Sequence, residues 1–220
     1  MSEKLEELPL FPLQTVLFPY AEQYLHIFEP RYQEMIQLCL KEDRPFGVVL
    51  IRSGTETDVT EPYLVGTAVR IVGMHTYEDG RIDIHVRGER RFRIRRLDDH
   101  RPYLVGYVEP VVETEIEKDS EAHELLARAK DEVEALIQRV FSHREFDVQV
   151  VFPPDPVALS FAIANLLPME NLDKQHMLET TDTLERVSAL LPFLENQILE
   201  VKQPFYKIGS QELAEWITPN

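Results

Sequence analysis

The chain has 220 residues, of which 44% are hydrophobic and 28% are charged, a composition that suits a globular protein of one large or two small domains. It carries 39 acidic residues against 23 Lys and Arg residues, and the formal charge of −16 disfavours attraction to nucleic acids and anionic membranes. Cys39 is the only cysteine, which excludes an intrachain disulfide and a thiolate zinc site.

The N-terminal residues lack the pattern of a signal peptide. The stretch MSEKLEELPLF is acidic where a signal peptide is basic, and Pro9 and Pro12 interrupt its apolar residues. No run approaches the roughly 18 apolar residues of a membrane span. We therefore expect a cytoplasmic protein with no membrane partner.

Residues 8–112 have the composition of short strands, which favours a barrel or a sandwich. The expected strands are 45–52, 63–73, 81–88, 90–97 and 102–112. One helix is expected at about residues 30–42. Pro30 suits the first helical position, and Tyr32, Met35, Ile36 and Cys39 follow at helical spacing. On that apolar stripe, Cys39 is predicted to be a buried structural thiol and not a nucleophile.

The segment YEDGR (77–81) predicts a β-hairpin. Asp79-Gly80 is a favoured two-residue turn, and in the resulting register facing residues have numbers that sum to 159. The alternate residues Ile82, Ile84 and Val86 then form one buried face. The same register places His75 and His85 on opposite faces, so we do not expect them to share a metal ion.

After about residue 118 the apolar pattern becomes helical. Helices are expected from Ser120 to Phe141, from an Asp155 cap to Leu167, over 170–178, and from an Asp182 capping box to Val201, with a kink at Pro192. The sequence therefore predicts an α+β protein: a strand domain at 1–117, a helical domain at 118–202 and a docked tail at 203–220.

The sequence contains no motif of a nucleotide-binding loop, a hydrolase nucleophile or a metalloprotease. We therefore expect no enzyme activity, cofactor or metal. The strand from Arg87 to Arg96 is the one basic run, and Arg91, Arg93 and Arg95 share one face of it. Three guanidinium groups on one face suit an anionic partner such as RNA. Alternatively, these arginines pair with acids on neighbouring strands and discourage edge-to-edge aggregation.

The octapeptide LHIFEPRY (25–32) allows two interpretations, a binding site or a junction between a strand and a helix. We favour the junction, with Leu25, Ile27 and Phe28 ending a strand, Leu25 and Ile27 on one face of it, and Glu29 at the start of the helix. Arg31 is then expected to pair with Glu34 or with an acid from the strands.

Several segments together resemble the N-terminal domain family of Lon proteases. They are 8–40 (LPLFPLQTVLFPYAEQYLHIFEPRYQEMIQLCL), 46–51, 65–71, 79–94, 102–109 and 158–198. The family signature includes Phe28, Glu29, Pro30, Arg31 and Tyr32. A later block matches at Lys174, Gln175, Leu178, Glu179 and Arg186, with Val187 where Leu is usual.

The resemblance implies a PUA-like β pseudo-barrel followed by a C-terminal α-helical bundle. It also implies a stand-alone, non-catalytic member, because the ATPase loop and the Ser-Lys dyad of full proteases are missing from this sequence. The implied function is binding of unfolded or degron-bearing polypeptides or of a protein partner, as an adapter or holdase, with self-association left open. We expect an exposed apolar patch where the strand part meets the helical part. The alternative is an RNA- or anion-binding module that uses the Arg87–Arg96 strand.

Overall fold

The computed structural model describes residues 5–54, 61–114, 120–141 and 152–200, which form two compact units. The strand unit comprises the described residues up to Val112 together with Asn171–Glu179, and the helical unit comprises the remainder. Residues 171–179 therefore group with the strands, whereas the sequence assigned all of 118–202 to the helical part. The expected tail at 203–220 lies outside the described residues.

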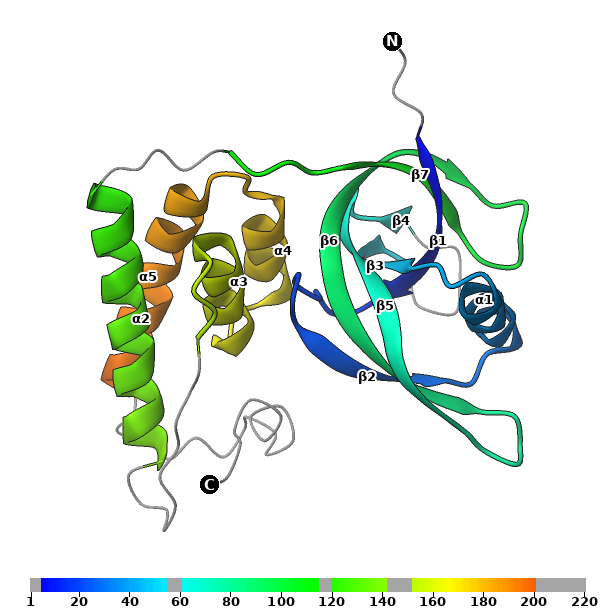
Figure 1. The fold of residues 1–220 in the computed structure, drawn as a ribbon, viewed down its shortest axis with the longest axis horizontal. Coiled ribbons are helices and arrows are strands. Elements are labelled where there is room, and N and C mark those ends of the chain that lie inside the picture. The colour runs from blue at the N-terminus through cyan, green and yellow to red at the C-terminus, as the bar shows by residue number, and fades with distance from the viewer. Residues whose placement is uncertain (1–4, 55–60, 115–119, 142–151, 201–220) are drawn as a thin grey trace. The chain divides into compact units, whose positions relative to one another are not determined.

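The strand unit contains a seven-stranded, mostly antiparallel sheet whose strands curve around one another (Figure 1). The strands are β1 (Glu6–Leu13), β2 (Glu22–Ile27), β3 (Phe46–Ser53), β4 (Glu61–Pro62), β5 (Val65–Thr76), β6 (Ile82–Asp98) and β7 (Val105–Pro110). Strand β1 pairs in antiparallel fashion with β7 and in parallel fashion with β3. The pairings β1–β7–β6–β5–β3–β1 consequently form a closed ring, in which residues 6–9 of β1 pair with β7 and residues 10–13 pair with β3.

Strand β6 is a single strand of 17 residues, where the sequence predicted two strands broken at Gly88. The Gly88 N–H donates to the Ala21 carbonyl (2.8 Å), and the Tyr20 N–H donates to the Gly88 carbonyl (2.9 Å). A Cβ atom at this position would collide with the Phe18 carbonyl oxygen. The glycine therefore permits close approach of a second segment and does not end the strand.

Close packing around Phe92 defines one of two apolar clusters in the strand unit. In this cluster, Phe92 is fully buried with Leu10 and Val49. The intervening residues of β1 and β3 lie on the opposite side of each strand and belong to the second cluster. Gly66 lies against the aromatic ring of Phe92. A Cβ atom at position 66 would lie 2.8 Å from Phe92 Cζ and 2.7 Å from Val49 Cγ1, and it would also collide with the Val48 carbonyl oxygen. The residue at position 66 must therefore lack a side chain.

Helix α1 (Pro30–Lys41) packs its predicted stripe into the second cluster. Tyr32, Met35, Ile36 and Cys39 are all buried, which confirms the helical spacing read from the sequence. Phe11 packs edge-on against Tyr32, with ring centroids 4.4 Å apart. Burial raises the pKa of the Cys39 thiol to about 11, as expected for a structural thiol.

Helix α4 (Asn171–Glu179) is anchored to the strands by side-chain bonds to backbone carbonyls. Gln175 Nε2 donates to the Val65 carbonyl (3.1 Å), and Asn171 Nδ2 donates to the Gln14 carbonyl (2.5 Å). At the other end of the helix, the buried Arg91 donates through Nη1 to the Leu178 carbonyl (2.6 Å). Because helix carbonyls in the last turn lack partners within the helix, the arginine supplies a donor that the helix needs.

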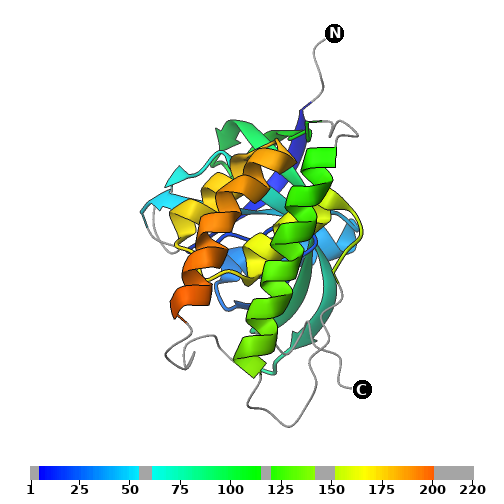
Figure 2. The ribbon, with the colours of Figure 1, turned by 90° about the vertical axis from the view of Figure 1, so that its left-hand side faces the viewer.

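The helical unit is built from α2 (Ser120–Phe141), α3 (Pro156–Leu166) and α5 (Thr183–Glu200), which pack against one another. Helices α2 and α5 lie side by side (Figure 2). Asp155 caps α3 by accepting from the Ala158 N–H (2.8 Å), and Asp182 accepts from the first turn of α5, so both predicted caps are confirmed. No helix within the described ranges is long and apolar enough to cross a membrane.

The fully buried Arg186 organises the core of the helical unit. Its guanidinium donates to Ser160 Oγ (2.8 Å), Thr183 Oγ1 (3.0 Å) and the Thr180 carbonyl (2.6 Å), and pairs with Glu113 Oε2 (3.2 Å). Burial lowers the pKa of Arg186, while the Glu113 carboxylate acts in the opposite direction. These acceptors offset the cost of removing the charge from water.

Gly66→Ala should destabilise the protein by about 1–3 kcal/mol, because the neighbouring carbonyl and ring have no room to move aside. Gly73→Ala is the matched control, since its Cβ atom would lie 3.4 Å from His85 Cβ, an ordinary contact. Urea unfolding followed by circular dichroism measures both variants. Equal stability of the two variants would show that the packing around Phe92 is looser than described.

Arg186→Met should cost about 3–5 kcal/mol of unfolding free energy, because it leaves the buried acceptors without a donor. Arg128→Met in the same unit removes the i,i+4 pair of a solvent-exposed arginine with Glu132 (2.9 Å), and loss of such a pair should cost about 0.3–0.5 kcal/mol. Chemical denaturation of both variants tests the difference, and a loss below 1 kcal/mol for Arg186→Met would contradict the network, since about 1 kcal/mol is the worth of a single hydrogen bond.

Cys39 should not react with a maleimide in the folded protein at pH 8, because the reactive species is the thiolate and burial keeps the thiol protonated up to about pH 11. The same chain unfolded in guanidinium chloride should react readily and serves as the control. Absorbance or mass measurement over time gives the two rates. Similar rates in the two states would mean that the thiol is open to solvent.

Candidate functional site

Strands β2, β6 and β5 form a three-stranded arm with one buried face and one exposed face. Residues 82–87 of β6 pair with β2 on one side and with β5 on the other. Ile82, Ile84 and Val86 are buried together with Leu25 and Ile27, which confirms the buried face predicted for the hairpin. The opposite side, which we call the aromatic–histidine face, consists of Glu22, Tyr24, His26, Phe28, Gly73, His75, Tyr77, Asp83, His85 and Arg87.

The hairpin that joins β5 to β6 has a register one residue away from the predicted one. Tyr77 N–H donates to the Arg81 carbonyl (2.9 Å), and Gly80 adopts a φ of +87°, so the loop has three residues instead of two. Facing residues consequently have numbers that sum to 158, as in the pairs His75–Asp83 and Gly73–His85. The glycine takes the left-handed position of a three-residue loop, an arrangement that competes with the Asp-Gly turn.

This shift corrects the predicted placement of two histidines. Because side chains alternate between faces, a shift of one residue moves a whole set to the other side of the sheet. His75 and His85 lie on the same face, since the partner of His75 is Asp83, two residues before His85. The expectation that the two imidazoles occupy opposite faces was therefore wrong.

Asp83 ties the three strands of the arm together through its side chain. Tyr77 Oη donates to Asp83 Oδ2 (2.5 Å), and His26 Nδ1 lies 2.5 Å from Asp83 Oδ1. These hydrogen bonds, that of Tyr77 first, lower the pKa of the Asp83 carboxyl, which therefore stays ionised. The same bond raises the pKa of the Tyr77 phenol. One carboxylate thus fixes side chains from β2 and from the end of β5.

Aromatic rings on this face are held in place and still meet solvent. Tyr24 stacks on His85 with centroids 4.4 Å apart and an interplanar angle of 9°, and His75 meets Tyr77 edge-on at 4.7 Å. His85 Nε2 lies at ion-pair distance (3.0 Å) from a Glu22 carboxylate oxygen. The exposed fractions of Tyr24 and Phe28 are 61% and 56%. Ordered but exposed aromatic surface is typical of protein-binding sites.

The segment Phe28–Tyr32 joins the arm to α1. Phe28 lies outside the core and near His26, with centroids 6.0 Å apart. Arg31 pairs with Glu29 (2.9 Å), and its guanidinium lies 4.6 Å from the centre of the Tyr32 ring. The expected partner was Glu34 or an acid from the strands. The Glu29 carboxylate makes no hydrogen bond to the helix N-terminus, because it faces the guanidinium instead.

The arginines of the basic strand are spread over different environments. Arg91 is buried and bonded to α4, Arg93 is partly buried, and Arg95 is exposed and bonded to Glu109 (2.6 Å). Arg90 pairs with Glu6 (2.6 Å) on β1. The second interpretation from the sequence, pairing with acids on neighbouring strands, describes Arg95, whose partner lies on β7, whereas the partner of Arg90 lies on β1, the strand beyond β7. This distribution gives no support to RNA binding.

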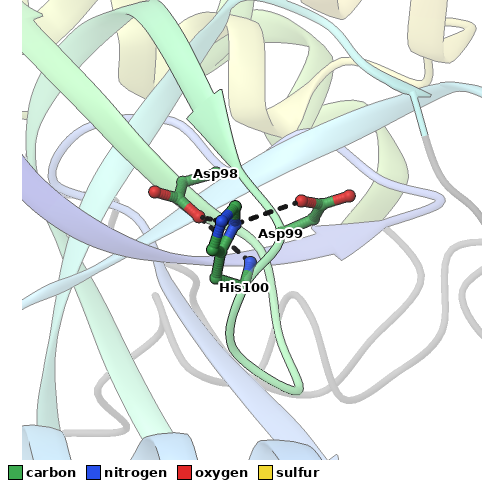
Figure 3. Close-up of side chains that lie close together, drawn as sticks. All are labelled: Asp98, Asp99 and His100. Atoms are coloured by element: carbon green, nitrogen blue, oxygen red, sulfur yellow. Dashed lines mark hydrogen bonds and ion pairs between the residues drawn. The ribbon is translucent and has the colours of Figure 1, made fainter.

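Asp98, Asp99 and His100 are the one group of three metal-type ligands among the described residues (Figure 3). They are consecutive in sequence, and the His100 N–H donates to Asp98 Oδ1 (3.0 Å) while His100 Nδ1 lies 2.9 Å from the same oxygen. Side chains of Asp99 and His100 are almost fully exposed. A local turn motif accounts for the cluster, and we infer no metal site from it.

Comparison with known proteins connects this fold to one family. The model of the ATP-dependent protease La (LON) substrate-binding domain matches residues 7–196. Lon proteases of Aquifex aeolicus and Syntrophus aciditrophicus are each 28% identical and match 95% and 94% of this chain, which spans 27% of the length of each relative. The structure of a Lon N-terminal domain protein from Xanthomonas campestris is similar with a TM-score of 0.64 and 28% identity over 86% of this chain and 98% of that one.

A second solved structure, the N-terminal domain of a Mycobacterium avium complex Lon protease, has a TM-score of 0.68 over 87% of this chain and 99% of that one. Its identity of 20% supports the fold alone. The family match covers most of the residues that form both units, including the arm and the Arg186 network. This chain belongs to the family of ATP-dependent protease La (LON) substrate-binding domains.

Proposed function

We propose that this chain is a non-catalytic recognition module that binds unfolded or degron-bearing polypeptide through the aromatic–histidine face. The observation that carries the proposal is the exposure of Tyr24 and Phe28 on an ordered, regular sheet face. Tyr and other aromatic side chains dominate binding energy in protein interfaces, since they bury a large area at a small entropic cost. Membership of a substrate-binding family supports the same function.

The proposal extends to the role and the architecture. A module that holds exposed segments without a nucleotide acts as an adapter if it serves one partner and as a holdase if it serves many. We assign the closed ring of strands to a PUA-like pseudo-barrel and the packed helices α2, α3 and α5 to a helical bundle, with cytoplasmic location. The apolar patch between the strand and helical parts, self-association and the patch of Arg91, Arg93 and Arg95 for an anionic partner stay predictions.

The double variant Tyr24→Ser, Phe28→Ser should bind unfolded protein at least about tenfold more weakly, because two aromatic contacts are lost. The probe is a fluorescein-labelled, reduced and carboxymethylated protein, and anisotropy measures its binding. Val112→Ser, Leu172→Ser is the control, since these apolar residues are equally exposed but lie outside the face. Circular dichroism verifies folding of every variant.

Two results would contradict the proposal. If the unaltered chain does not bind the probe, the recognition function fails. If both double variants bind equally well, the chain binds polypeptide elsewhere. Crosslinking followed by identification of captured proteins separates the two roles, since one recurring partner indicates an adapter and many unfolded proteins indicate a holdase.

A further inference from the structure

Strand β2 is an edge strand. Within the part of the chain that the structure describes, it pairs with β6 alone, in a regular register from Glu22–Arg87 to Ile27–Ile82. An edge strand presents a row of unpaired N–H and C=O groups, to which another extended chain can add. The same strand supplies Tyr24 and His26 to the aromatic–histidine face.

The alternation of hydrogen bonds along β6 shows which groups of β2 are free. Because Tyr77 N–H bonds to the Arg81 carbonyl, odd-numbered residues of β6 direct their backbone groups to β5. Even-numbered residues of β6 therefore bond to β2, where their partners are Gln23, Leu25 and Ile27. The backbone groups of the intervening residues Glu22, Tyr24 and His26 point away from β6 to the open edge.

Side-chain distances agree with this assignment. In antiparallel sheets, pairs that do not exchange backbone hydrogen bonds bring their side chains closer together than bonded pairs do. The pairs assigned here as non-bonded are Tyr24–His85 and His26–Asp83, and they make a 4.4 Å ring stack and a 2.5 Å contact. Tyr24 and His26 thus carry both the free backbone groups and the exposed side chains.

The arm has a second edge, which is protected. Residues 70–76 of β5 pair with β6 but not with β3. A bulge interrupts this edge between Ile71 and Gly73, and Arg70 bears ion pairs to Asp43 (2.9 Å) and Glu89 (2.6 Å). Bulges and charged side chains are devices that prevent strand addition. Strand β2, with the sequence EQYLHI, has no bulge, proline, lysine or arginine.

Building on the polypeptide-binding function proposed above, we propose that bound polypeptide adds to β2 as an antiparallel strand. Its backbone bonds to Tyr24 and His26, and its alternate side chains lie on the aromatic–histidine face. Bonds to the main chain are the same for every sequence, which suits recognition of many unfolded segments. The preferred segment carries aromatic residues at alternate positions, where they meet the exposed rings of Tyr24 and Phe28. Basic residues stand between them, because the formal charge of −16 attracts a cationic segment.

The occupant is a foreign segment and not a second copy of this chain. Each copy carries a formal charge of −16, so two copies repel one another, whereas the same charge attracts a basic segment. A short extended segment also needs no groove, since the edge and the exposed rings supply backbone and side-chain contacts together.

The test uses a fluorescein-labelled ten-residue peptide of alternating Phe and Lys. In antiparallel pairing, residues opposite Tyr24 and His26 exchange backbone bonds with them and place their side chains on the same face. N-methylation of the Phe residues should therefore weaken binding about tenfold or more, whereas N-methylation of the Lys residues should change it less than about twofold. Both modified peptides keep the side chains and the charge of the parent.

Hydrogen exchange followed by NMR gives a second measurement on the unmodified protein. The peptide should slow exchange of the Tyr24 and His26 amides, while those of Gln23 and Leu25, already bonded to β6, should change little. A pair of variants gives a third measurement. His26→Pro removes the backbone N–H that points to the open edge, so it should weaken peptide binding more than His26→Ala, which keeps that N–H.

The outcomes separate this inference from the function on which it rests. If neither this peptide nor unfolded protein binds, the recognition function itself fails. If the parent peptide binds but both methylated peptides bind equally well and the two amides gain no protection, strand addition is wrong and the function stands. Protection of the two amides that grows with protein concentration in the absence of peptide would identify a second copy as the occupant and overturn the assignment.

Discussion

Two buried guanidinium groups donate hydrogen bonds to carbonyls at the C-terminal end of α4. The strand unit depends on one of them and the helical unit on the other. Arg91 donates to the Leu178 carbonyl and Arg186 to the Thr180 carbonyl, each at 2.6 Å. Carbonyls at the C-terminal end of a helix lack intrahelical partners and carry the negative end of the helix dipole, so cationic donors suit them. This requirement explains why Arg91 and Arg186 are buried, although the charge of each residue, considered alone, would indicate ligand binding.

The aromatic–histidine face depends on a second constraint, the register of the β5–β6 hairpin. Gly80 in a left-handed conformation creates a three-residue loop, and that loop decides which residues face solvent along the arm. With the register observed, Asp83 reaches both His26 and Tyr77 and orders their rings. A shift by one residue would bury the carboxylate and direct Ile82 and Ile84 to solvent.

Much of the fold follows from local patterns in the sequence. The stripe of α1, the caps at Asp155 and Asp182 and the buried face at Ile82 were predictable, because each depends on residues close together in the chain. The burial of Arg91 and the grouping of α4 with the strands were not, because they depend on hydrogen bonds between residues 87, 110 and 157 positions apart in the chain. The alternation of exposed Tyr24 and His26 with buried Leu25 and Ile27 was visible in EQYLHI. No local pattern in the sequence predicts that Asp83 lies beside His26.

An exposed strand edge beside exposed rings is a risk of aggregation, and the rest of the molecule limits that risk. The second edge of the arm is bulged and charged, every residue of β1 pairs with either β7 or β3, and β2 has only six residues. The formal charge of −16 separates copies from one another. A protein that binds unfolded chains, the function proposed above, cannot protect every edge, because the groups that would block a second copy would block the bound polypeptide as well. Negative charge resolves this conflict, since it acts on copies of the protein and spares neutral or basic segments.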